Sequence, residues 1–119
     1  MSAAMHFEIP VPPSTNNLFA TIAGKRRSTT DYLRWQRQAD LLIMLQQREQ
    51  ARIAPPVAVT VTIPQSKQRR DLDNYLKAAL DALVRCRVIP DDSDLVVKRI
   101  TAQIGATMEC RVDVEGFVK

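Results

Sequence analysis

The sequence predicts a small α/β domain in which a mixed sheet of about four strands carries two main helices, in the order β-α-β-α-β-β. Residues 57–63 alternate valine or isoleucine with alanine or threonine, which is typical of a strand with one apolar face. The stretches 30–51 and 72–84 repeat apolar residues at helical spacing. Because 119 residues with 45% hydrophobic side chains suffice for one core, residues 1–119 are expected to form a single domain.

The N-terminal half is expected to contain one strand and one helix. Residues 6–11 predict a short strand that ends at prolines. Residues 12–17 are rich in turn formers, and residues 24–28 form a second flexible, basic stretch. The first helix should begin near residue 30 and continue to about residue 51, because Pro55 and Pro56 forbid more.

The C-terminal half is expected to add a second helix and two more strands. The apolar stripe of residues 72–84 marks the inward face of that helix. Residues 95–104 predict a strand that runs beside residues 57–63. Gly105 should then turn the chain, and residues 107–115 should pair with residues 95–104 as a hairpin.

Composition narrows the classes of protein to consider. The net charge of +4 and the pI near 9.4 favour nucleic acid or another anionic partner. No apolar run approaches the roughly 20 residues that span a bilayer, and the N-terminus lacks a signal peptide, so a cytoplasmic protein without a membrane partner is expected. The sequence has no CxxC pair and one histidine, His6. A zinc site is therefore not expected, and Cys86 and Cys110 are predicted to be reduced, partly buried thiols.

Two carboxylates stand at the predicted junction between the central strand and the second helix. If this segment is extended, Asp71 and Asp73 lie on one face, as metal ligands would. The alternative is that one of them caps the helix. Lys77 follows Asp73 by four residues, so it can form a helix ion pair or contact a phosphate. Asp81 continues the stripe, either as a surface acid or as a supporting acid of the site.

A second acidic group, Asp91 and Asp92, follows Pro90 after the helix. Its simplest interpretation is a turn. If the next strand starts at the sheet edge where the strand 57–63 ends, Asp92 would approach Asp71. The three carboxylates Asp71, Asp73 and Asp92, with Asp91 as a further candidate, would then suit Mg²⁺, which prefers oxygen ligands.

Two basic clusters flank these acids, and they are either solvated loops or contacts to DNA phosphates. The few aromatic residues do not support a platform for stacking single-stranded bases, so backbone contact is the better hypothesis. The candidates for this role are Lys67, Arg69, Arg70, Lys25, Arg26 and Arg27.

These motifs resemble the RusA family of Holliday junction resolvases, which prophages often carry. The resemblance is carried by Arg69-Arg70-Asp71-Leu72-Asp73-Asn74, by Lys77-Ala78-Ala79-Leu80-Asp81-Ala82-Leu83, by Asp91-Asp92 and by the entry segment Pro10-Val11-Pro12-Pro13-Ser14-Thr15-Asn16-Asn17. Tyr32 and Trp35 also fit the layout. Family members often have a glycine before the acidic turn, where this chain has residues 85–89 without one.

The resemblance implies a homodimeric, Mg²⁺-dependent endonuclease that resolves four-way DNA junctions by paired nicks in recombination and repair, with Mn²⁺ as a substitute ion. It implies metal-binding catalytic roles for Asp71, Asp73 and Asp92, a catalytic role for Lys77, and DNA contacts by Asn16 and Asn17. The alternatives are a nuclease for flaps or other branched DNA, a protein that binds branched DNA without cutting it, and a structural interaction module.

Overall fold

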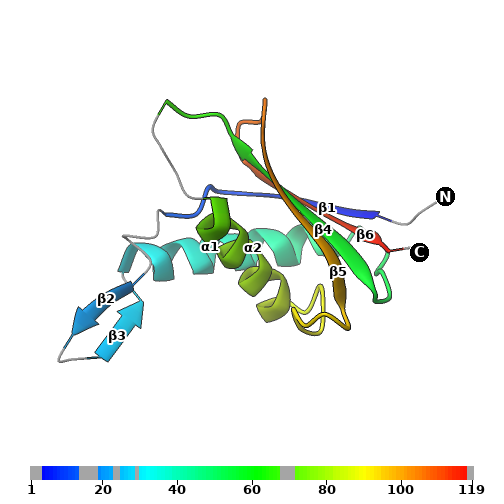
Figure 1. Ribbon diagram of the computed structural model, residues 1–119, viewed down its shortest axis with the longest axis horizontal. Coiled ribbons are helices and arrows are strands. Elements are labelled where there is room, and N and C mark those ends of the chain that lie inside the picture. The colour runs from blue at the N-terminus through cyan, green and yellow to red at the C-terminus, as the bar shows by residue number, and fades with distance from the viewer. Residues whose placement is uncertain (1–3, 14–18, 23–24, 29, 68–71, 118–119) are drawn as a thin grey trace.

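The computed structural model describes residues 4–13, 19–22, 25–28, 30–67 and 72–117 of the chain. Its main element is a four-stranded sheet in the order β1-β6-β4-β5, and Figure 1 shows two helices beside one face of this sheet. The strands are β1 (Ala4–Ile9), β4 (Val57–Pro64), β5 (Val97–Gly105) and β6 (Cys110–Gly116). The helices are α1 (Thr30–Gln47) and α2 (Leu72–Arg85). The predicted α/β class, with a mixed sheet and two main helices, is confirmed.

Strand β4 lies inside the sheet, between β6 and β5, and most of its side chains are buried. Val57, Val59, Val61 and Ile63 face the helices, as the alternation predicts. The opposite face is less exposed than a half-buried strand would be, since Ala58 and Thr62 are also buried. Strand β6 pairs antiparallel with β4 on one side, and β5 pairs parallel with it on the other.

The predicted hairpin between the last two strands is wrong. Strand β6 lies between β1 and β4, pairing antiparallel with both, whereas β5 pairs with β4. The more apolar strand takes the inner position of the sheet, because β6 buries Cys110, Val112 and Val114. The largely exposed β5 lies at the edge. Gly105 does lie at a close approach, because a Cβ there would stand 2.6 Å from Cγ2 of Thr62 on β4.

The segment before α1 also differs from the prediction. The backbone forms an antiparallel hairpin of β2 (Phe19–Ile22) and β3 (Lys25–Ser28), where a flexible stretch was expected. The hairpin lies at the N-terminal end of α1, away from the sheet (Figure 1). The chain then enters α1, which ends at Gln47, four residues before the predicted end.

Polar contacts join the helices to each other and to β1. Arg85 of α2 donates from Nε and Nη2 to the two carboxylate oxygens of Asp40 on α1, at 3.0 and 2.9 Å. Trp35 of α1 donates from Nε1 to the carbonyl oxygen of Pro10, at 2.8 Å, and so holds the chain where it leaves β1. These contacts hold α2 against α1 and α1 against the end of β1.

Both cysteines are free thiols, as predicted. Cys110 is buried and Cys86 is partly buried. Burial raises the pKa of Cys110 to about 12 and that of Cys86 to about 11, so both thiols are weak nucleophiles at neutral pH. Among the described helices, none combines the length and the apolar character needed to cross a membrane.

Candidate functional site

The candidate site is built on the exposed face of α2. Tyr75, Ala79 and Leu83 are among the residues that bury the opposite face, and this leaves Asp73 and Lys77 in solvent. Asp73 lies in the first turn, where a negative charge is favoured by the helix dipole. Asp71, Arg69 and Arg70 lie outside the described residues.

Lys77 does not form the helix ion pair that was the simpler interpretation. Within the described part of the chain, no carboxylate lies within ion-pair distance of its ammonium group. Lys77 nevertheless acts on Asp81, one turn further along the helix, through the electrostatic attraction that opposes the pKa shift of that acid. The ammonium group is therefore exposed and available to a phosphate.

Asp81 links the helix to the acidic turn. The pKa of Asp81 is raised, first because burial disfavours its charged form, and the nearby charge of Asp92 raises it further. The positive charges of Lys77 and Arg85 oppose this shift. Asp81 was considered only as a surface or supporting acid, and the signal that identifies it is its four-residue spacing from Lys77.

The two aspartates of the acidic turn, Asp91 and Asp92, have different surroundings. Asp91 Oδ1 accepts hydrogen bonds from the Ser93 backbone N–H at 2.9 Å and from the Ser93 hydroxyl at 2.6 Å. These bonds stabilise the charged form and lower the pKa of Asp91. Asp92 is exposed and makes no hydrogen bond or ion pair with a described residue. Asp91 thus holds the turn, and Asp92 remains available to a ligand.

The turn is shaped by the way α2 ends. Arg87 has a φ of 59°, in the left-handed region that favours glycine. The Arg87 N–H donates to the carbonyl of Val84 at 3.1 Å, and the Val88 N–H donates to the carbonyl of Leu83 at 2.9 Å. This pair of bonds is a Schellman motif, with Arg87 at the position where glycine is usual. Family members often have a glycine before the acidic turn, and in this chain Arg87 adopts the left-handed conformation that such a glycine would favour.

The parallel register of the sheet decides how the acids are arranged. Strand β5 starts beside the start of β4, because Val97 is the partner of Val57. Asp92 therefore approaches the sheet at the end opposite to Ile63, and the condition for its approach to Asp71 within one chain is not met. The loop with Asp92 lies beyond the C-terminal end of α2, whereas Asp73 lies in the first turn. Along α2 the rise from Asp73 to Asp81 is about 12 Å.

The donor set suits a hard divalent cation, although the described residues of one chain do not complete a site. Asp73 and Asp92 offer exposed carboxylate oxygens, which are the ligands that Mg²⁺ prefers. The described residues contain no group of three or more histidine, cysteine, aspartate or glutamate side chains that could hold a metal. A complete site needs Asp71, which lies outside the described residues, or a carboxylate from elsewhere.

The basic candidates are described only in part. Lys67 is exposed in the segment between β4 and α2. The backbone of Lys25, Arg26 and Arg27 forms β3, on the hairpin that projects beyond α1 (Figure 1). Asn16 and Asn17 lie outside the described residues, as do Arg69 and Arg70.

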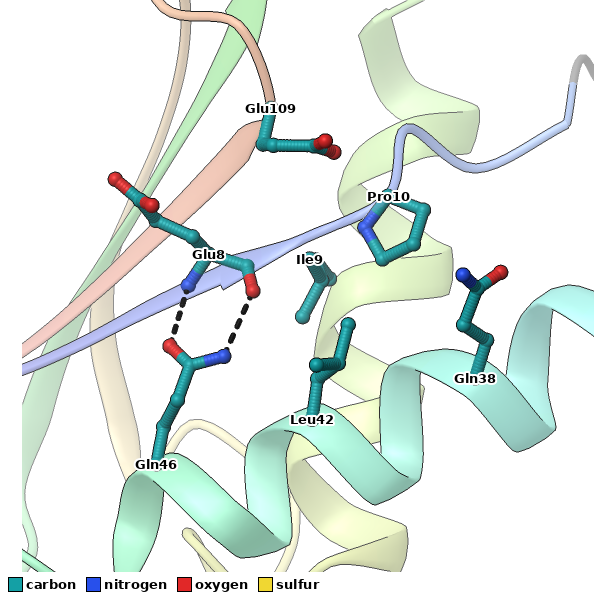
Figure 2. A pocket seen from close by; sticks show the side chains of 7 residues that line it. All are labelled: Glu8, Ile9, Pro10, Gln38, Leu42, Gln46 and Glu109. Carbon is teal, nitrogen blue, oxygen red and sulfur yellow. Dashed lines mark hydrogen bonds between the residues drawn. The ribbon is translucent and has the colours of Figure 1, made fainter.

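A cleft of about 350 Å³ between β1 and α1 lies apart from these residues (Figure 2). Its lining includes Glu8 and Glu109 but no lysine or arginine, and the full set is Glu8, Ile9, Pro10, Gln38, Leu42, Gln46 and Glu109. Because two carboxylates at its rim repel phosphate, this cleft is a poor site for a nucleic acid.

The exposed carboxylates and lysine on and after α2 are side-chain types that bind metal ions and phosphate, which indicates the class of small α/β proteins that act on phosphate esters. Comparison with known proteins supports this class, because the family model described as endodeoxyribonuclease RusA matches residues 9–115. The chain belongs to this family of Holliday junction-resolving endodeoxyribonucleases, whose members generally depend on a divalent metal. No curated protein matches the chain at a significant level.

Proposed function

We propose that this protein is a homodimeric, Mg²⁺-dependent endodeoxyribonuclease that resolves four-way DNA junctions by paired nicks, in cytoplasmic DNA recombination and repair. The observation that carries the proposal is the family match over residues 9–115, because this range includes β4, α2 and the acidic turn together. Mn²⁺ is the expected substitute ion because it also accepts oxygen ligands.

Asp71, Asp73 and Asp92 are the proposed metal ligands. When bound, Mg²⁺ would polarise the scissile phosphate and offset the repulsion between these carboxylates and DNA. Lys77 is the proposed partner of the charge that develops on the phosphate, because its exposed ammonium group has no ion-pair partner among the described residues. Asp91 contributes less, because Ser93 already occupies one of its oxygens.

The proposed dimer would bring together acids that lie apart within one chain, namely Asp73 at the start of α2 and Asp92 after its end. In a two-fold pair, Asp92 of one chain can approach Asp71 and Asp73 of the other. Two such shared sites would stand on opposite sides of the two-fold axis, as the paired nicks of a symmetric junction require. In this arrangement the dimer and the metal site form together.

The basic residues are proposed to contact the DNA backbone. Replacing Arg69 or Arg70 by Ala should weaken junction binding and reduce the log–log salt slope by roughly one unit for each phosphate that the variant no longer neutralises. Arg34→Ala is the matched control because Arg34 is exposed on α1 and its nearest carboxylate, that of Asp31, is 3.8 Å away. An unchanged salt slope in both basic variants would exclude backbone contact by Arg69 and Arg70.

A cleavage gel tests the proposal as a whole. The purified protein is mixed with a synthetic four-way junction, a flap and a linear duplex, each with and without Mg²⁺. The expected result is symmetric nicking of the junction that needs Mg²⁺, with little cutting of the duplex. Preferred cutting of the flap would favour the flap nuclease, and binding of the junction without cutting in any metal ion would favour a DNA-binding protein.

A further inference from the structure

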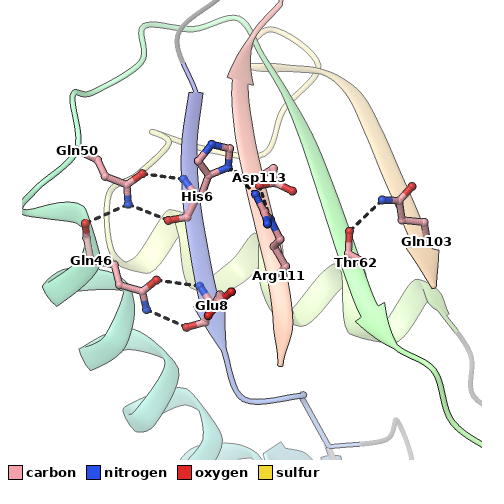
Figure 3. A network of polar contacts seen from close by, with 8 residues as sticks. All are labelled: His6, Glu8, Gln46, Gln50, Thr62, Gln103, Arg111 and Asp113. Carbon is pink, nitrogen blue, oxygen red and sulfur yellow. Dashed lines mark hydrogen bonds and ion pairs between the residues drawn. The ribbon is translucent and has the colours of Figure 1, made fainter. Parts of the chain in front are cut away.

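The outer edge of β5 is the open side of the main sheet. Among the described strands, β5 pairs with β4 alone, and Figure 3 shows it as the last strand on its side of the sheet. The strand spans nine residues, Val97–Gly105, and its helix-facing positions include Ile100 and Ile104. These two side chains are 42% and 48% exposed, which is high for isoleucines on the apolar face of a sheet. A long edge with exposed apolar residues invites pairing with another strand.

The opposite edge of the same sheet is closed by side chains (Figure 3). Gln46 of α1 accepts from the Glu8 N–H and donates to the Glu8 carbonyl, both at 2.8 Å. Gln50 does the same to His6, at 2.7 and 2.8 Å. The two amides thus satisfy the backbone groups that a neighbouring strand would otherwise use. The chain blocks strand addition at β1, and no comparable side chain contacts the backbone of β5 within the described residues.

We infer that a second copy of this chain pairs its β5 antiparallel with β5, joining two sheets into one of eight strands. The inference rests on the homodimer of the proposed function and specifies its surface. Antiparallel pairing of identical strands about a two-fold axis is self-complementary, so a second copy offers the matching edge without any further partner. Each strand would then satisfy the free backbone groups of the other.

The side chains select one register. Because partners across an antiparallel pair lie on the same face, the two-fold axis must pass at a residue and not between two. An axis at Ala102 places Ile100 opposite Ile104 of the partner subunit on the helix side. A shift of the axis to Thr101 would place Ile104 opposite the partner's Lys98. The register about Ala102 is therefore the one in which every exposed isoleucine of either strand lies opposite another isoleucine.

The charges of the strand are compatible with this register. An axis at Ala102 keeps Lys98 and Arg99 far from their own copies, at opposite ends of the paired strands. Arg99 is also directed toward its own chain, because Nη2 lies 3.4 Å from Oε1 of Glu115 and the guanidinium stands 5.8 Å from the Phe117 ring centre. At the two ends, the exposed Leu95 would approach the exposed Met108 of the partner subunit.

A cysteine at the axis tests the register directly. In an antiparallel pair the Cα atoms of opposite residues lie about 4.5 or 5.5 Å apart, and both values allow a disulfide. Under mild oxidation, Ala102→Cys should form a linked dimer at least tenfold faster than Leu41→Cys, whose position on the outer face of α1 is 59% exposed. Wild-type protein controls for the native thiols. Equal rates for the two variants would overturn the inference.

A charge on the edge tests the surface in solution. Ile104→Lys should raise the dimer dissociation constant at least tenfold by light scattering, while Leu41→Lys leaves it unchanged and circular dichroism confirms that both variants are folded. A monomeric wild type, or dissociation by Leu41→Lys alone, would overturn the inference. Neither measurement uses DNA, so a protein that pairs through β5 but cuts no junction would refute the proposed function and leave the β5 interface standing.

Discussion

Replacing Arg87 by Gly should stabilise the protein, because Arg87 closes α2 in a left-handed conformation. At a φ of 59° a side chain with a Cβ is strained, by about 1–2 kcal/mol relative to glycine. Glycine gives back part of this gain because it loses more backbone entropy on folding, about 0.5–1 kcal/mol. A net gain of about 0.5–1 kcal/mol remains, which corresponds to a rise in Tm of roughly 2–4 °C for a chain of this size.

Thermal unfolding followed by circular dichroism measures the effect. Arg87→Ala is the control, since it removes the guanidinium but keeps the Cβ, and it should melt close to the wild type. The Schellman bonds from Arg87 to Val84 and from Val88 to Leu83 should persist in both variants. If Arg87→Gly melts no higher than Arg87→Ala, backbone strain at this helix end is absent and the assignment of Arg87 as a glycine-like position is wrong.

Four further predictions concern the candidate site. Lys77→Ala should lower the single-turnover cleavage rate about 10²-fold while changing the free energy of unfolding by less than about 0.5 kcal/mol, and a normal rate would remove Lys77 from the chemistry. Asp73→Asn and Asp92→Asn should each abolish cleavage but keep junction binding in a gel-shift assay, and near wild-type cutting would exclude these ligands. Ca²⁺ should support binding with little hydrolysis, because it takes more ligands at longer distances than Mg²⁺, and equal turnover in the two ions would contradict this. Asp81→Asn should raise Tm at pH 7, where the partly buried carboxylate is charged. Because the raised pKa of Asp81 makes the folded state bind the proton more strongly than the unfolded state, this gain in Tm should shrink as acid protonates Asp81. A gain in Tm that does not change with pH would contradict burial as the cause of the raised pKa.

The elements with strong local periodicity could be predicted from the sequence. The alternation that ends at Ile63 and the apolar stripe that includes Tyr75 and Leu83 give β4 and α2 nearly at their observed bounds. In both segments the pattern reports which residues are buried, and burial determines the element.

The order of the strands could not be predicted in the same way. Alternation shows which face of a strand is buried but not which strand lies beside it. Residues 97–105 and 110–116 both look like hairpin strands in sequence, yet only the second set buries its apolar face fully, and it lies between β1 and β4. The hairpin of β2 and β3 was missed because its second strand, Lys25–Ser28, contains no apolar residue.

The candidate site shows the same division between local and long-range information. The spacing from Asp73 to Lys77 and Asp81 could be predicted, because one helix carries all three. The position of Asp92 relative to Asp71 depends on the parallel pairing of Val57 with Val97, which no local pattern reports.

Complementation between two inactive variants tests the central claim most directly. The substrate is a four-way junction with Mg²⁺, and the proteins are Asp73→Asn, Asp92→Asn and their equimolar mixture after exchange of subunits. If the metal site is shared between two chains, each variant alone is inactive, and each mixed dimer holds one intact site, so the mixture should nick the junction. A mixture that stays as inactive as its components, beside a wild type that cuts, would contradict the shared site, and a wild type that cuts no junction would contradict the proposed function itself.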